Sequence, residues 1–171
     1  SGTDSQGAQR NLRATLASSR NFESCAARTA ELWQAELDRA QVAGGSAAQK
    51  RIYATALYHA FSVPNLWSDV DGRYRGMDGR IHSDADHAHY TVFSLWDTYR
   101  TAHPLYALVQ PERTRDFIAT MLDMHEQSGR LPVWELAGNE TNCMIAYHSV
   151  SVLADAHAKG YEIDSERLIK A

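Results

Sequence analysis

Tryptophan side chains lie close to carboxylates and amides at three places in this sequence, a combination typical of sugar-binding sites. A flat indole ring can stack on the C–H face of a pyranose, while carboxylate and amide groups hydrogen-bond to its hydroxyls. We therefore interpret these residues as candidate substrate-binding groups. They are Trp67, Asp69 and Arg73, then Trp96 and Asp97, and finally Trp134, Glu135, Asn139 and Glu140.

A structural role is the alternative for each of these polar residues taken singly. Asp69 and Asn139 have short polar side chains that often cap helices or brace loops. Asp97 could pair with Arg100 or Arg75 instead of facing a ligand. The clustering with tryptophan is what favours the binding interpretation.

Two segments deserve consideration as metal sites, and neither gives a confident prediction. Residues 69–72 read Asp-Val-Asp-Gly like a calcium loop, but Arg80 stands where an EF-hand needs its bidentate glutamate. Residues 82–89 contain three histidines and two aspartates without helical i, i+4 spacing, so we interpret them as a solvated loop. We expect no metal ligands within this chain.

Composition narrows the range of partners. The 171 residues carry 17 Lys+Arg against 21 Asp+Glu, a formal net charge of -4. This mild negative charge argues against nucleic acid or anionic lipid as the main partner. No run of apolar residues approaches the ~18 that a membrane span needs. We expect neither a nucleic-acid nor a membrane partner.

The elements that must position the candidate residues are predicted to be helices. Apolar residues recur at helical spacing, with capping residues before the runs and Gly or Pro after them. No strand-type alternation competes, so the predicted fold class is all-α, with 1–20 as an extended or linker-like lead-in. The predicted helices cover 21–42, 47–61, 90–102, 111–127 and 140–159, and another begins near 164.

The lengths of the connections alternate between short and long along the chain. Residues 62–89 and 128–138 form the long connections, and those near 43–46, 103–110 and 161–163 are short. Because antiparallel helices send alternate connections out of opposite ends, the long loops should gather on one face. This pattern predicts an array of helical hairpins, such as an (α/α) toroid, with a functional face made by the long loops. A plain up-down bundle would fit the helices but would not need such loops.

Four strings of the sequence resemble the glycoside hydrolase family 92 exo-α-mannosidases, and the likeness continues in unbroken order from about 21 to 160. The strings are PNLWSDVDGRYRG at 64–76, YTVFSLWDTYR at 90–100, QPER at 110–113 and GRLPVWELAGNET at 129–141.

This resemblance implies a calcium-dependent enzyme that removes terminal α-linked mannose from glycans with inversion, and that is secreted or periplasmic. It also implies an N-terminal β-sandwich packed on an (α/α)6 toroid. Residues 1–171 are then a single partial domain, whose helical hairpins form about the first half of that toroid. The family's general acid, general base and most calcium ligands have no match here, so we expect no catalytic residue within this chain and little activity from it alone. Asp97 and Glu135 then become candidates for gripping sugar hydroxyls, beside Trp96 and Trp134.

Three functional hypotheses remain at this point. The leading one is the mannose-binding portion of such an enzyme, whose exposed flank binds the remainder of the enzyme or a second copy. A stand-alone helical carbohydrate-binding or interaction module without catalysis is the second. The third is a complete small hydrolase with Asp97 and Glu135 as its acid and base.

Overall fold

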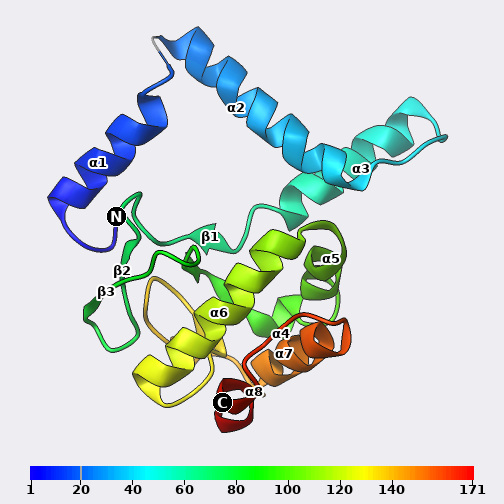
Figure 1. The fold of residues 1–171 in the computed structure, drawn as a ribbon. Coiled ribbons are helices and arrows are strands. Elements are labelled where there is room, and N and C mark those ends of the chain that lie inside the picture. Colours follow the sequence, from blue (N-terminus) through cyan, green and yellow to red (C-terminus); the bar gives the residue numbers. More distant parts are fainter. Residues whose placement is uncertain (20) are drawn as a thin grey trace.

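The computed structural model describes residues 1–19 and 21–171, and it is mainly helical. Helices α1 to α3 form an arm that extends from a body built around α6 (Figure 1). The helices are α1 (Ser5–Leu16), α2 (Phe22–Leu37), the 3-10 turn η1 (Asp38–Ala40), α3 (Ala47–Ala60), α4 (Leu95–Thr98), α5 (Ala102–Val109), α6 (Pro111–Ser128), α7 (His148–Ala158) and α8 (Ser165–Lys170). No described helix has both the length and the apolar character needed to cross a membrane.

Three of the predicted helices are confirmed with small changes in their bounds, because their ends carry strong local signals. Asn21 and Ser46 each accept a hydrogen bond from the backbone N–H three residues later, which starts α2 and α3. Pro111 occupies the first turn of α6, and Gly129 ends it at a φ of 77°. The helix predicted to begin near 164 is also present as α8, capped by Asp164.

The extended lead-in predicted for 1–20 is wrong over most of its length. Residues 5–16 form α1, and the carboxylate of Asp4 caps it by accepting the N–H of Gly7 at 2.6 Å. Leu12 and Leu16 of α1 stay exposed, and hydrogen bonds between Asn11 and the loop at Asp69 and Val70 hold the helix in place. Residue 20, the last of the predicted lead-in, lies outside the described residues.

The helix predicted for 90–102 is also wrong. The segment forms two short strands, β4 (Tyr90–Thr91) and β5 (Phe93–Ser94), before α4 begins. Val92 between them has a φ of 68°, which no helix permits. Residues 90–93 are all β-branched or aromatic, so they favour strands once partners from distant loops are available.

The prediction for 140–159 placed the helix start too early. Helix α7 begins at His148, and the preceding residues form an irregular loop with positive φ values at Asn142 and Ala146. The polar side chain of Glu140 bonds to loop backbone instead of entering a helix. Tertiary contacts therefore outweigh the helical pattern of residues 140–147.

Short antiparallel strands occur within the long connections, so the all-α prediction needs this correction. Strand β1 (Asn65–Leu66) pairs with β4, β2 (Arg73–Arg75) pairs with β3 (Ile81–Ser83), and β5 pairs with β6 (Trp134–Glu135). Each pair satisfies backbone groups of a loop that is partly buried. The β5–β6 pair brings the connection between α3 and α4, which is longer than predicted, against the connection between α6 and α7.

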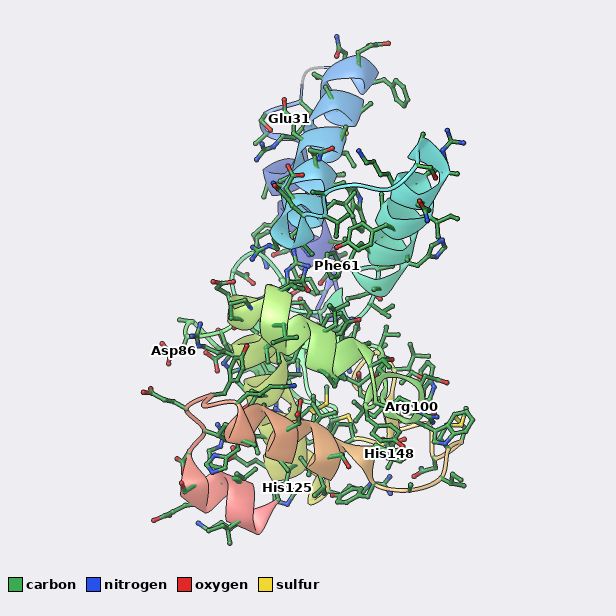
Figure 2. All side chains as sticks on the ribbon, turned by 90° about the vertical axis from the view of Figure 1, so that its right-hand side faces the viewer. Glu31, Phe61, Asp86, Arg100, His125 and His148 are labelled. Atoms are coloured by element: carbon green, nitrogen blue, oxygen red, sulfur yellow. The ribbon has the colours of Figure 1, made fainter. Side chains whose placement is uncertain are left out.

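The core of the body lies around α6. Its apolar face presents Phe117, Met121 and Met124, each nearly free of solvent contact. Tyr106 of α5 packs on Phe117 and donates its hydroxyl to the carbonyl oxygen of Ala60 at 2.6 Å. This bond fixes the end of α3 to the body, close to Phe61 at the junction of the arm and the body (Figure 2). Completion of a toroid stays a prediction.

Candidate functional site

The candidate site begins where β5, at the end of the connection between α3 and α4, pairs with β6, in the connection between α6 and α7. Phe93 lies opposite Glu135, and Ser94 lies opposite Trp134. Helix α4 follows β5 directly, so the pairing brings Trp96 and Asp97 to the same region as Trp134. Trp96 and Trp134 are about forty positions apart in the sequence, and the sheet pairing and the bond from the N–H of Leu95 to the carbonyl oxygen of Val133 bring them together.

The carboxylate of Glu135 holds the two connections together from inside. It accepts the hydroxyl of Thr91 at 2.9 and 3.1 Å, the N–H of Val92 at 3.1 Å and the N–H of Gly138 at 2.6 Å. The Thr91 hydroxyl in turn accepts the N–H of Ala137 at 2.7 Å. Glu135 has no exposed surface, and this burial raises its pKa to about 7 despite the donors around it.

Glu140, later in the same loop, has a similar role. Its carboxylate accepts the N–H groups of Val133 at 2.7 Å, of Trp134 at 3.1 and 3.2 Å, and of Asn142 at 3.0 Å. Asn139 is exposed, and its amide donates to the carbonyl oxygen of Glu140 at 3.3 Å. In this conformation both glutamates shape the loop that carries Trp134, and a direct contact with sugar stays a prediction.

Backbone strain is concentrated in these same loops. Val92, Ala137, Asn142 and Ala146 have φ values between 53° and 69°, a region that L-residues with a Cβ rarely adopt. Such conformations persist only where the surrounding contacts enforce them, and they are frequent at binding sites. Hydrogen bonds of Glu135 and Glu140 supply part of that enforcement.

The exposed part of the site is an aromatic surface beside one carboxylate. Trp96 is 38% exposed, and Asp97 is exposed and accepts a hydrogen bond from the hydroxyl of Ser94. The guanidinium of Arg100 lies 6.0 Å from the ring centre of Trp96 and 5.1 Å from that of Tyr99. The alternative partnership of Asp97 with Arg100 is thus replaced by cation–π contacts.

His148, at the start of α7, belongs to this surface although sequence reasoning missed it. Its ring stacks on Tyr99 with centres 3.9 Å apart, and Figure 2 shows Arg100 and His148 at the same edge of the molecule. Its buried Nε2 has no hydrogen-bond partner among the described residues, an uncommon state for a buried polar atom. No spacing in the sequence connects Tyr99 with His148, because the contact depends on how α4 and α7 pack.

Asp69 belongs to a second region, where its loop contacts the N-terminal residues of the chain. Its buried carboxylate accepts hydrogen bonds from Ser1 at 2.8 Å, Thr3 at 2.5 Å and Asn11 at 2.8 Å. Burial raises its pKa, but the hydrogen bonds from these side chains outweigh burial and lower the pKa overall. Asp69 therefore fastens the start of the arm to the loop before β2.

Arg73 and Trp67 share this second region. Arg73 pairs with Asp71 at 3.0 Å and with Asp4 at 3.2 Å, and Trp67 donates its indole N–H to the carbonyl oxygen of Arg75 at 2.8 Å. The nine candidate residues thus divide into two groups, one at β5–β6 and one at α1. Their contact with a sugar stays a prediction in both.

The interpretation of residues 82–89 as a solvated loop is wrong at its end. His89 is 1% exposed, and its ring stacks on Tyr74 with centres 3.7 Å apart. His87 is partly buried and contacts Asp123 of α6 at 3.0 Å. The sequence did not indicate this burial, because the partner Asp123 lies 36 positions from His87 and no local spacing connects the two residues.

Calcium, which the family resemblance implies, has no complete set of ligands among the described residues. It prefers six to eight oxygen ligands. The carboxylates of Glu135 and Glu140 are already occupied by N–H donors, and Asp97 stands alone on the surface. The His87, His89 and Asp123 cluster supplies two nitrogens, which do not suit calcium.

Comparison with known proteins agrees with this geometry. The family model described as the glycosyl hydrolase family 92 catalytic domain matches residues 7–171. The chain therefore belongs to glycosyl hydrolase family 92. A search of curated protein sequences gives no match.

Two solved structures are particularly similar. The family GH92 alpha-mannosidase BT3965 from Bacteroides thetaiotaomicron, also solved in complex with mannoimidazole, is 39% identical with a TM-score of 0.88. The family GH92 inverting mannosidase BT2199 from the same organism is 28% identical with a TM-score of 0.89. The match covers 96% of this chain and 22% of the first protein, and 99% and 23% for the second. The chain thus spans about a quarter of the length of either relative.

Proposed function

We propose that this chain is the mannose-binding portion of an enzyme that hydrolyses terminal α-linked mannose from glycans. The main support is the exposed Trp96–Asp97 pair, placed beside Trp134 by the β5–β6 pairing, in a chain of a family whose similar members are mannosidases. An aromatic face beside an exposed carboxylate suits a pyranose, whose C–H face can stack on the ring while its hydroxyls donate to the carboxylate.

Each residue of the surface has a separate role in this proposal. The Asp97 carboxylate accepts hydrogen bonds from two neighbouring hydroxyls, since an ionised carboxylate has acceptor sites for both. The rings of Trp96 and Trp134 exclude water and orient the sugar. Glu135 and Glu140 hold the loop that carries Trp134 in position through their bonds to its backbone N–H groups.

Proton transfer is assigned to parts of the enzyme other than this chain. A complete small hydrolase would need Asp97 and Glu135 as an acid–base pair, flanking the scissile bond. Glu135 does not fit that arrangement, because its carboxylate is buried and already accepts four hydrogen bonds. Its pKa of about 7 would by itself suit a general acid. Inversion remains part of the proposal and is supported by an inverting mannosidase among the similar structures. Calcium dependence remains part of it through the family resemblance alone.

The arm is proposed to bind further parts of the same enzyme. Helix α2 has no buried residue, and Phe22 and Ile52 are 80% and 68% exposed. Apolar side chains in this state are typical of an interface that awaits its partner. A second copy of the chain is the alternative occupant. A secreted or periplasmic location completes the proposal, and it depends on the family resemblance alone.

Mannoimidazole binding by this chain tests the sugar site directly. Titration calorimetry should detect binding to the wild-type chain and a loss of at least ~10-fold in affinity for Asp97→Ala, the effect of ~1.4 kcal/mol. Asp155→Ala is the matched control, because Asp155 is partly exposed on α7 and pairs only with the neighbouring Lys159 among the described residues. Equal affinity of wild type and Asp97→Ala would contradict the assigned role.

An assay of mannose release separates the three functional hypotheses. The substrate is α-1,2-linked mannobiose, with and without a calcium chelator. We expect no turnover from the chain alone, and turnover would support a complete hydrolase instead. Binding without turnover, even after the remaining parts of a family 92 enzyme are supplied, would support the stand-alone binding module.

A further inference from the structure

Two histidines and one aspartate converge in the body, in a region that the proposed sugar site does not use. His87 Nε2 lies 3.0 Å from Asp123 Oδ2, and His89 Nδ1 lies 3.7 Å from the same oxygen. One ligand atom from each of the three lies within 4.8 Å of the others. His87 and His89 are two positions apart in a non-helical segment, so both rings can face α6, which carries Asp123.

The ring of His89 is held in place, yet one of its nitrogens has no partner. His89 is 1% exposed, and the ring of Tyr74 stacks on the imidazole at an interplanar angle of 11°. Nδ1 makes no hydrogen bond within the described part of the chain, because 3.7 Å to Asp123 Oδ2 is too long. A buried polar atom without a partner is costly, and this one points into the cluster.

We propose that His87, His89 and Asp123 bind a transition-metal ion, with Zn²⁺ as the best fit. Tetrahedral zinc with bonds of about 2.0–2.2 Å places its ligand atoms about 3.4 Å apart, a value between the 3.0 and 3.7 Å observed here. Two imidazoles and one carboxylate form a donor set that suits zinc, whereas calcium takes oxygen ligands and the two imidazole nitrogens argue against it. The ion would give His89 Nδ1 the partner it lacks.

The neighbours of the three ligands are those expected around a zinc site. Asp84 Oδ2 lies 3.2 Å from His87 Nδ1, so it can hold the tautomer that presents Nε2 to the ion. Arg167 of α8 donates to Asp123 Oδ1 at 2.8 Å and leaves Oδ2 facing the histidines. Both partners are outside the ligand set, and both orient it.

A fourth ligand can come from water in an adjoining polar cavity of about 470 Å³, whose lining includes Tyr74, His82 and Asp123. Three protein ligands with one position left for water is a known form of zinc coordination. The bound ion would connect the segment before β4 to α6. Because β4 contains Thr91, the ion would also order the strand that bonds to Glu135.

Zinc titration of the chain tests this proposal. Calorimetry after treatment with a chelator should show one site per chain. Thermal unfolding should move to higher temperature with Zn²⁺. Co²⁺ should give the intense visible absorption of a tetrahedral site. His87→Gln and Asp123→Asn should each lose more than ~100-fold in affinity, and Asp84→Asn about 10–100-fold, as expected for an outer partner.

His125→Gln is the matched control. It removes an imidazole from the same helix, two positions after Asp123 and therefore on another face, and it should bind zinc like the wild type. The ligand variant His87→Gln should stay folded, because His87 is only partly buried. Circular dichroism can verify its fold. Absence of a zinc-dependent change in unfolding, or equal affinity in His87→Gln and wild type, would overturn the proposal and leave the cluster as an ion-pair network that docks α8.

Discussion

The side chains of Thr91 and Glu135 meet in the interior although they are 44 positions apart in the sequence. The Thr91 hydroxyl donates to the carboxylate at 2.9 Å and accepts the N–H of Ala137 at 2.7 Å. One hydroxyl thereby joins the strand before Trp96 to the loop after Trp134. The position of the proposed sugar surface depends on this connection.

Replacing Glu135 by glutamine should destabilise the fold. Both carboxylate oxygens accept backbone N–H groups, from Gly138 and from Val92, so either orientation of an amide sets one NH₂ against an N–H donor. We expect a loss of about 1–3 kcal/mol in the free energy of unfolding, measured with urea. Glu31→Gln is the control on exposed α2, and a loss of similar size there would contradict the explanation.

Glu135 should also make stability depend on pH in a defined direction. Burial raises the pKa of Glu135 from 4.5 to about 7, so the folded chain retains a proton that the unfolded chain has released. Its contribution is complete below pH 4.5 and is lost as pH rises to about 7, a change of about 3 kcal/mol. The stability of wild type relative to Glu135→Gln should fall across this window. A constant difference would contradict the shifted pKa.

His103 should make the free energy of unfolding rise with pH, whereas Glu135 makes it fall. His103 is 5% exposed among Phe93, Tyr106 and Phe117, and burial lowers its pKa from 6.5 to about 4. The unfolded chain binds a proton first, so stability present above pH 6.5 is lost as pH falls to about 4. His103→Phe keeps the aromatic packing and should gain up to about 3 kcal/mol over wild type at the acid end. Equal acid sensitivity of the two proteins would show that another group is responsible.

The N-terminal helix α1 should loosen when Asp69 is replaced by alanine. The variant loses the carboxylate that accepts hydrogen bonds from Ser1, Thr3 and Asn11, and with it the main connection between this end of the chain and the loop before β2. Hydrogen exchange in residues 5–16 should accelerate by about 5- to 150-fold, which corresponds to about 1–3 kcal/mol of local opening. Exchange in α6 should not change. Asp86→Ala, in an exposed part of the loop, should leave both helices as in wild type.

Polar substitutions on the arm should reduce association without unfolding the chain. Phe22 and Ile52 are largely exposed, so serine at both positions removes apolar surface and little packing. Light scattering at rising concentration should show less association for Phe22→Ser/Ile52→Ser than for wild type. The urea midpoint should stay nearly constant. Unchanged association would remove the arm as the interface.

Features set by neighbouring residues were predictable from the sequence. Asn21 and Ser46 start helices through bonds to residues three positions later, and Gly129 ends α6 because it tolerates a positive φ. The apolar stripe of α6 predicted its buried face. The family could also be inferred, because the strings at 64–76, 90–100 and 129–141 are long and specific.

Features set by distant partners were not predictable. Apolar residues recur at helical spacing over 90–102, yet residues 90–94 form strands because distant residues of β1 and β6 supply the pairing. Residues 5–16 form a helix whose position depends on Asp69. In both cases contacts across tens of residues contribute more free energy than local propensity does.

The sequence by itself determined the residue types of the candidate site, the helix signals and the family. Tertiary structure alone decided that Glu135 and Glu140 are buried inside the loops, that Asp69 and Arg73 hold the arm, and that His87 and His89 face Asp123. The physical reason is that burial and hydrogen bonding depend on which groups meet in space. A carboxylate has the same chemistry at every position in the sequence, but its surroundings set its pKa, its partners and its access to a ligand.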